Sequence, residues 1–126
     1  MKRVATIILN RNLPNETDQL WKQVDDNNHE TTDIYVVEAG SDSNNLSTHT
    51  TWHVNDPESL RQGLRYSRGM NFALSELWKE NKFKNYEAFF LITNDTEFQT
   101  PHPIQDLLDV LDKHPKVGIV SPCSDQ

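Results

Sequence analysis

Four short runs of mainly apolar residues divide this sequence and limit the folds that are open to it. The runs do not alternate with polar residues. Continuous β-branched and aromatic runs are typical of strands that are buried on both faces in a parallel sheet. A weaker strand candidate ends at Asn55-Asp56-Pro57. Together the patterns predict strands over 4–9, 34–37, 51–54, 89–93 and 117–120.

Stretches with helical periodicity separate the apolar runs. Apolar residues recur at helical spacing over 16–24, 59–78 and 104–111, so that each stretch has one apolar face. Pro103 suits the first position of the last of these helices. The alternation of strands and helices predicts an α/β fold, and specifically a Rossmann-like three-layer α/β/α sandwich with a mainly parallel sheet.

Length and composition fit a single domain that covers residues 1–126. A chain of 126 residues with 35% hydrophobic residues can form one core but not two. Its formal net charge is −7, which argues against nucleic acid as a partner because a phosphate backbone would be repelled. A small anionic ligand would need positive potential supplied locally by a metal ion, a helix N-terminus or a few arginines.

The cysteine content and the first residues exclude further classes of protein. Cys123 is the single cysteine, so the chain has neither an intrachain disulfide nor a cysteine-rich zinc site. The apolar run after Met1-Lys2-Arg3 stops at Asn10, which is too short for a signal peptide or a membrane span. We therefore expect a cytoplasmic protein.

Polar residues gather where the predicted strands end, and ligands of open α/β sheets bind at that edge. Asp95 and Glu97 follow the strand 89–93, and two carboxylates there suit Mg²⁺ or Mn²⁺. In the alternative interpretation Asp95 only caps a turn and Glu97 is solvated. Glu38, before the turn at Gly40, could accept from a ribose hydroxyl or a base N–H, or belong to an ordinary turn.

Arginines interleaved with glycines over 59–74 form the other candidate site. Arg65 and Arg68 could approach a diphosphate together with backbone amides near Gly69. Arg61 fits better on a solvated helix face. Asn71 lies beside the apolar face of the predicted helix and could be a satisfied structural amide.

In this order along the chain, the segments resemble family 2 glycosyltransferases of the GT-A fold. The opening segment 4–12 looks like the family's first strand and polar loop. Val36-Val37-Glu38-Ala39-Gly40-Ser41 is similar to its valine-valine-aspartate-x-glycine-serine turn, and Gly69-Met70-Asn71 to its glycine-x-asparagine segment. Leu91-Ile92-Thr93-Asn94-Asp95-Thr96-Glu97 resembles the variant D-x-D motif of rhamnosyltransferase-like members, and 114–122 the helix-to-strand passage that follows.

The resemblance implies a domain that binds a nucleotide-diphosphate sugar (a UDP-, GDP- or dTDP-sugar) for polysaccharide biosynthesis. The sugar would pass to the hydroxyl of a saccharide or membrane-associated acceptor, with Mn²⁺ or Mg²⁺ as cofactor. Asp95 would hold the cation, with Glu97 as a second candidate. Glu38 stands where the family has aspartate, and Thr93 where D-x-D has its first aspartate. The donor-binding residues implied are Asn10, Arg11, Asn12, Glu38, Gly40, Arg65, Arg68, Asn71, Asn94 and Asp95.

The family's catalytic base and acceptor-binding elements would follow the last residue of this chain. We therefore expect that the acceptor half is missing, that the chain alone does not transfer sugar, and that it self-associates through an uncovered face. Two alternatives are a nucleotide-binding module without chemistry and a receiver or flavodoxin-like signalling domain. The second is disfavoured because Asn10-Arg11-Asn12 contains no acid pair after the first strand.

Overall fold

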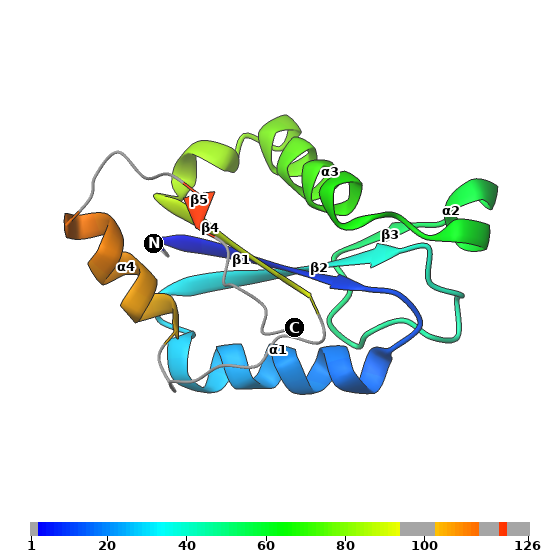
Figure 1. Ribbon diagram of the computed structural model, residues 1–126, viewed down its shortest axis with the longest axis horizontal. Coiled ribbons are helices and arrows are strands. Elements are labelled where there is room, and N and C mark those ends of the chain that lie inside the picture. The colour runs from blue at the N-terminus through cyan, green and yellow to red at the C-terminus, as the bar shows by residue number, and fades with distance from the viewer. Residues whose placement is uncertain (1–2, 94–102, 114–118, 121–126) are drawn as a thin grey trace.

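The fold is of the α/β class, with a parallel sheet at its centre. The computed structural model describes residues 3–93, 103–113 and 119–120 (Figure 1). Within them five strands form one sheet in the order β3-β2-β1-β4-β5, and every adjacent pair is parallel. The elements are β1 (Val4–Asn10), α1 (Pro14–Asn28), β2 (Thr32–Ala39), β3 (Trp52–Val54), α2 (Pro57–Gln62), α3 (Tyr66–Lys79), the 3₁₀ helix η1 (Phe83–Asn85), β4 (Ala88–Thr93), α4 (Pro103–Lys113) and β5 (Ile119–Val120).

β1 is the central strand, and all seven of its residues are buried. It pairs with β2 along its whole length, up to Asn10 opposite Glu38. On its other side it pairs with β4, up to Leu9 opposite Thr93. β1, β2 and β4 therefore end at the same edge of the sheet, where the sequence predicts the functional residues.

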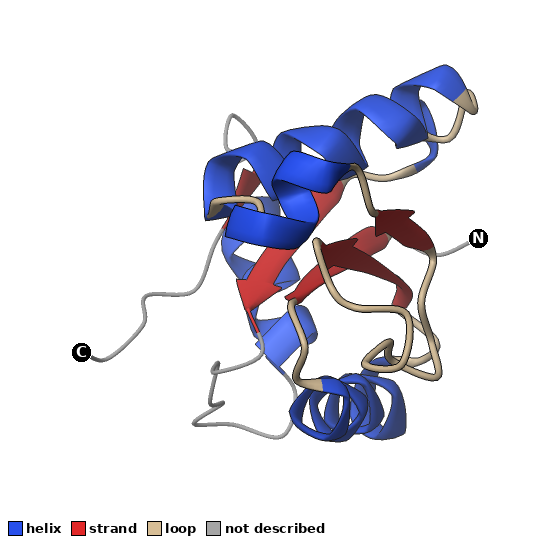
Figure 2. Cartoon of the chain, turned by 90° about the vertical axis from the view of Figure 1, so that its right-hand side faces the viewer, coloured by secondary structure: helices blue, strands red, loops and turns tan. Residues whose placement is uncertain are grey.

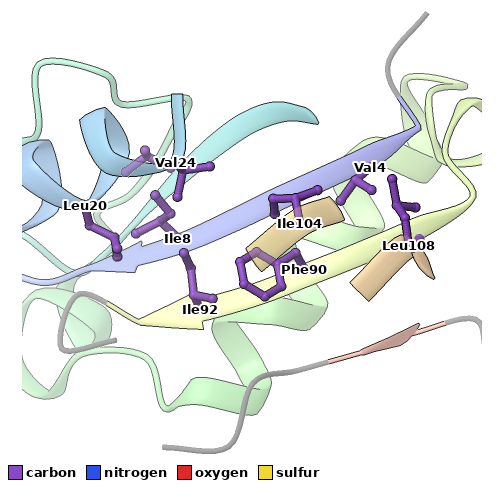
Figure 3. Packing of buried hydrophobic residues seen from close by; sticks show 10 residues of the cluster. Val4, Ile8, Leu20, Val24, Phe90, Ile92, Ile104 and Leu108 are labelled. Carbon is purple, nitrogen blue, oxygen red and sulfur yellow. The ribbon is translucent and has the colours of Figure 1, made fainter. Parts of the chain in front are cut away.

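Helices cover both faces of the sheet (Figures 1 and 2). The buried side chains of β1, β2 and β4 alternate between two separate clusters, one on each face. α1 and α4 pack on one face, and Figure 3 shows the side chains of that cluster. α3 packs on the other face through Met70, Ala73 and Leu77. No helix in the described part of the chain is long and apolar enough to cross a membrane.

The predicted strands are confirmed where they are described, but the single helix predicted over 59–78 is wrong. Two helices stand there, α2 and α3, and Gly63 separates them with φ of 75°. Its amide closes α2 on the carbonyl of Ser59 at 2.7 Å, and its positive φ then turns the chain away from the helix axis. Hydrophobic periodicity continues across the break, so it did not reveal the turn.

The break has a consequence for the candidate site. Because α3 begins at Tyr66, Arg65 and Arg68 lie at a helix N-terminus instead of on the middle of a long helix. A helix N-terminus carries a partial positive charge and unpaired amides, which suits a negatively charged ligand. Two smaller differences are that η1 was not predicted and that α1 and β2 extend beyond the predicted ranges. Of the predicted strand 117–120, residues 117 and 118 lie outside the described residues.

Removal of one core side chain tests the packing of α3 on the sheet. Leu77 is fully buried, so Leu77→Ala should lower the free energy of unfolding by about 2–5 kcal/mol through lost burial and a cavity. The matched control is Leu60→Ala, because Leu60 lies on α2 with 37% of its surface exposed and should change stability by only about 0.5 kcal/mol. Urea denaturation of both variants measures the difference. Equal losses would contradict the placement of α3.

Candidate functional site

The candidate site lies at the edge where β1, β2 and β4 end, and Figure 2 faces that side of the molecule. Its described parts are the loop after β1, the long loop between β2 and β3, and the helices α2 and α3. Of the residues implied by the glycosyltransferase resemblance, Asn10, Arg11, Asn12, Glu38 and Gly40 lie together here. Hydrogen bonds and close packing join them to the surrounding loops.

Asn10 and Glu38 form the buried base of the site. The Asn10 side-chain amide donates to Glu38 Oε1 at 2.7 Å, and both residues are 1% exposed or less. Glu38 Oε2 accepts from the Ser47 amide at 2.9 Å and from the Thr50 hydroxyl at 2.6 Å. The carboxylate thus receives three hydrogen bonds, which offset the cost of its burial.

This geometry gives Glu38 a structural task. Both of its oxygens are engaged by the protein, and the side chain has no surface open to a nucleoside. Through Ser47 and Thr50 it fixes the loop between β2 and β3 against the end of β1. The sequence predicts that Glu38 and Asn10 contact a ligand. In the structure the two side chains instead contact each other beneath the surface of the site.

Asn12 joins the two loops above this base. Its backbone has φ of 60°, a conformation that asparagine tolerates better than most residues. Its amide donates to Ser41 Oγ at 3.0 Å, and its side-chain oxygen accepts from the Asp42 amide at 2.8 Å. The loops after β1 and β2 therefore form one connected surface.

Arg11 extends the connection to α2. Its guanidinium donates to the carbonyls of Leu60 and Arg61 at 3.4 and 3.2 Å, at the end of that helix. A cation at a helix C-terminus is favourable because the last carbonyls carry partial negative charge. Both of these hydrogen bonds come from the same nitrogen, Nη2. Because Arg11 is also exposed, its other N–H groups can reach a ligand.

Gly40 allows α2 to sit directly over the end of β2. A Cβ atom at this position would lie 1.9 Å from the carbonyl oxygen of Ser59, and the residue has φ of 88°. The Leu64 amide donates to the Ala39 carbonyl at 3.2 Å beside it. Glycine is therefore required here by space as well as by conformation.

A second set of contacts, not predicted from the sequence, holds the loop between β2 and β3 from the side of α1. The Asp18 carboxylate accepts from the Ser47 hydroxyl and from the amide and hydroxyl of Thr48. The ring of His49 stacks on Trp21 with ring centres 3.6 Å apart. The run Ser47-Thr48-His49-Thr50 was a sequence signal, since such residues often hydrogen-bond loops, but it does not identify the partners.

The remaining predicted residues do not join this network. Arg65 and Arg68 are exposed at the start of α3. Hydrogen bonds from Ser59 hold the pKa of Asp56 below its ordinary value, and the charge of Arg68 lowers it slightly further. Asn71 lies on the outer side of α3, where it lines an open hollow with Leu74, Ser75, Trp78 and Lys79. Asn71 therefore lies away from the edge where β1, β2 and β4 end.

The predicted metal ligands belong to the segment that directly follows β4 in the sequence. Asn94, Asp95 and Glu97 lie outside the described residues, although they follow Thr93, the last residue of β4. Within residues 3–93, 103–113 and 119–120, no group of three or more His, Cys, Asp or Glu side chains could hold a metal ion. The cation remains a prediction from the sequence.

Substitution of Glu38 tests its role in fixing the loop. Glu38→Gln replaces one acceptor oxygen by an NH₂ group that faces other donors. The free energy of unfolding should fall by about 1.5–3 kcal/mol, the usual contribution of hydrogen bonds to a charged group. The Ser47 amide should also exchange faster with deuterium, because it donates to this carboxylate. Glu30→Gln is the control, since the Glu30 side chain is 89% exposed. Unchanged stability and exchange in Glu38→Gln would contradict the role.

Comparisons with known proteins do not assign the site. No protein-family model matches the chain, and no curated protein or solved structure matches it.

Proposed function

We propose that this chain is the nucleotide-sugar-binding domain of a glycosyltransferase that resembles family 2, and that the donor binds at the carboxyl edge between β1 and β4. One observation carries the proposal. β1 and β4 are neighbours, but β1 leads to β2 on one side and β4 leads to β5 on the other. In open α/β sheets the crevice at such a reversal is where ligands bind.

The strand order also bears on the alternatives. The order β3-β2-β1-β4-β5 is that of five strands of the doubly wound, Rossmann-like sheet, which supports that part of the prediction. In a flavodoxin-like or receiver-type sheet the third strand lies beside the first. Here β3 pairs with β2, at the edge of the sheet. The order therefore argues against the signalling-domain alternative.

Positive groups near the proposed crevice suit a diphosphate. Arg65 and Arg68 stand at the N-terminus of α3, and Arg11 lies over the end of α2. A diphosphate bound there would meet guanidinium groups and the positive end of a helix dipole, in a chain whose net charge is −7. Asn12 and the joined loops would form the wall beside the nucleoside, and Glu38 would hold that wall in position from below.

The proposed cofactor follows from the sequence of the segment after β4. Asp95, two residues beyond Thr93, would hold Mn²⁺ or Mg²⁺, with Glu97 as a second candidate. Such a cation, when bound, neutralises the leaving diphosphate. The described residues have other roles in this proposal. The arginines bind the phosphates, and Asn12 with its loops orients the nucleoside.

Calorimetry with free nucleotides tests the proposed site. UDP, GDP and dTDP are titrated into the full chain with Mn²⁺ and with EDTA, and one of them should bind with a Kd of about 0.1–1 mM when the metal is present. Arg68→Gln should weaken this binding about tenfold through loss of a charge-assisted hydrogen bond. Arg61→Gln is the matched control from the same segment. No binding of any of the three nucleotides with Mn²⁺ would contradict the proposal.

A pair of substitutions tests the assignment of the metal ligand. Asp95→Asn should abolish the difference between Mn²⁺ and EDTA, because a lost charged ligand costs about 1.5–3 kcal/mol. Glu97→Gln should weaken binding much less, since Asp95 occupies the closing position of the motif. Both variants are measured by the same calorimetric titration. Equal effects at the two positions would mean that the motif was aligned in the wrong register.

A further inference from the structure

Trp78 stands out on the face of α3 that points away from the sheet. It is 62% exposed, more than Leu13, Leu60 or Tyr66, the other exposed large hydrophobic residues in the described part of the chain. Its neighbours Met70, Ala73 and Leu77 point into the core. A single exposed apolar side chain is ordinary in itself, so its surroundings decide what it can do.

The indole is held in place by the fold. Its ring meets Phe83 edge-on with ring centres 5.6 Å apart, and Phe83 packs on Phe89 of β4 at 4.7 Å. The end of α3 is fixed as well: Asn81 has φ of 60°, the Asn81 amide donates to the Trp78 carbonyl at 3.1 Å, and the Lys82 amide donates to the Leu77 carbonyl at 2.8 Å. These are the two hydrogen bonds of a Schellman motif. Trp78 is therefore a fixed aromatic surface, with little ordering cost on binding.

Two open hollows share this indole. One has a volume of about 360 Å³, and Asn71, Ser75 and Lys79 are among the residues that line it. The other has a volume of about 200 Å³ and is lined by Asn81, Phe83 and Lys84 besides Trp78. We use the name Trp78 ridge for Trp78 together with these lining residues. Both hollows thus have an amide and an ammonium group besides the indole, and the first has the Ser75 hydroxyl as well.

The charges around the ridge leave a single lysine in excess, since Lys79, Lys82 and Lys84 stand against Glu76 and Glu80. Lys79 pairs with Glu76 at 3.7 Å, and Lys82 pairs with Glu80 at 3.3 Å. A nucleic acid or an anionic membrane would need a cluster of unpaired basic residues. A stable protein partner would need about 800 Å² of surface with few charges at its centre, whereas charged side chains surround this ring. A neutral ligand of modest size fits better.

We propose that the Trp78 ridge binds a neutral oligosaccharide. The C–H face of a sugar ring packs on an aromatic face, while its hydroxyls both donate and accept hydrogen bonds. The Asn71 and Asn81 amides can do both in return, Ser75 offers a hydroxyl, and the lysines donate. Two hollows beside one indole give room for a sugar residue on each side.

This site is separate from the proposed nucleotide crevice. Arg65 and Arg68 stand at the start of α3 and Trp78 in its last turn, a separation of about 15–20 Å along the helix. The proposal rests on the chemistry of the ridge and does not require that the carboxyl edge bind a nucleotide. The two sites can therefore fail independently in experiment.

NMR of the full chain gives the direct test. The chain has three tryptophans, so three indole N–H signals are expected. The signal that is lost in Trp78→Phe belongs to Trp78. Cellotetraose and maltotetraose are titrated separately, and one should shift the Trp78 signal with a Kd on the order of 1 mM while leaving the Trp21 and Trp52 signals in place.

Variants separate binding from folding. Trp78→Ala should weaken the saccharide at least about tenfold. Asn81→Gly removes an amide from the second hollow, and glycine suits the left-handed backbone there, so the fold is kept while affinity falls about threefold. Leu60→Ala, a substitution of another exposed apolar residue, should leave saccharide binding unchanged. UDP, GDP and dTDP binding should be the same in all of these variants.

Several results would overturn the proposal. A Trp78 signal that neither saccharide moves at about 10 mM would exclude the site at the expected affinity. A shift that is equal in wild type and Trp78→Ala, followed at the Asn81 amide, would place binding elsewhere. Concentration-dependent dimerisation that Trp78→Ala abolishes would make the ridge an interface between copies of the chain. Sedimentation of the chain with phosphatidylglycerol vesicles, lost in Trp78→Ala, would make it a membrane contact.

Discussion

β1 has no side that faces water, and this burial fixes the arrangement of everything around it. Each of its seven residues is buried, and it lies between β2 and β4 with helices on both faces. Buried backbone groups must find partners, so both neighbouring strands have to pair with it in register. That register in turn brings the ends of three strands to one edge. The candidate site exists because the backbone groups of β1 need hydrogen-bond partners on both neighbouring strands.

At that edge the buried carboxylate of Glu38 holds a loop in place. Burial of a charge is expensive unless hydrogen bonds compensate for it, and Glu38 obtains three. Its partners come from β1 and from two positions of the loop between β2 and β3. Aspartate is one methylene shorter, so the reach of glutamate offers a physical reason why Glu38 stands where the glycosyltransferase turn that this segment resembles has aspartate. Asp18 and Asn12 hold the same loop from other directions, and the loop becomes part of the rigid framework.

How much of this could be predicted from the sequence depends on the kind of signal. Continuous apolar runs identified the strands, because burial on both faces leaves no polar alternation. Periodicity reports which face of a helix is apolar but not where the helix ends, so the turn at Gly63 was missed. Asn10 and Glu38 were expected at the edge because both follow an apolar run. Their burial and their partners Ser47 and Thr50 depend on the path of a loop, which has no period. Asn71 was assigned by motif, and a motif does not say which side of α3 faces the strand ends.

The pairing of β1 also has a kinetic side. The contacts of β1 with β2 join residues that are 28 positions apart in the sequence. Its pairing with β4 brings together segments that are 84 positions apart, as Arg3 and Glu87 illustrate. Closing the longer loop costs about 1 kcal/mol more chain entropy by the logarithmic dependence on length. The pairing of β1 with β2 around α1 is therefore favoured first, and sheets built on such distant pairings fold slowly. Until β4 arrives, one edge of β1 offers unpaired backbone groups among apolar side chains. We expect that transient edge to be the point at which newly made copies of this chain are most prone to pair with one another.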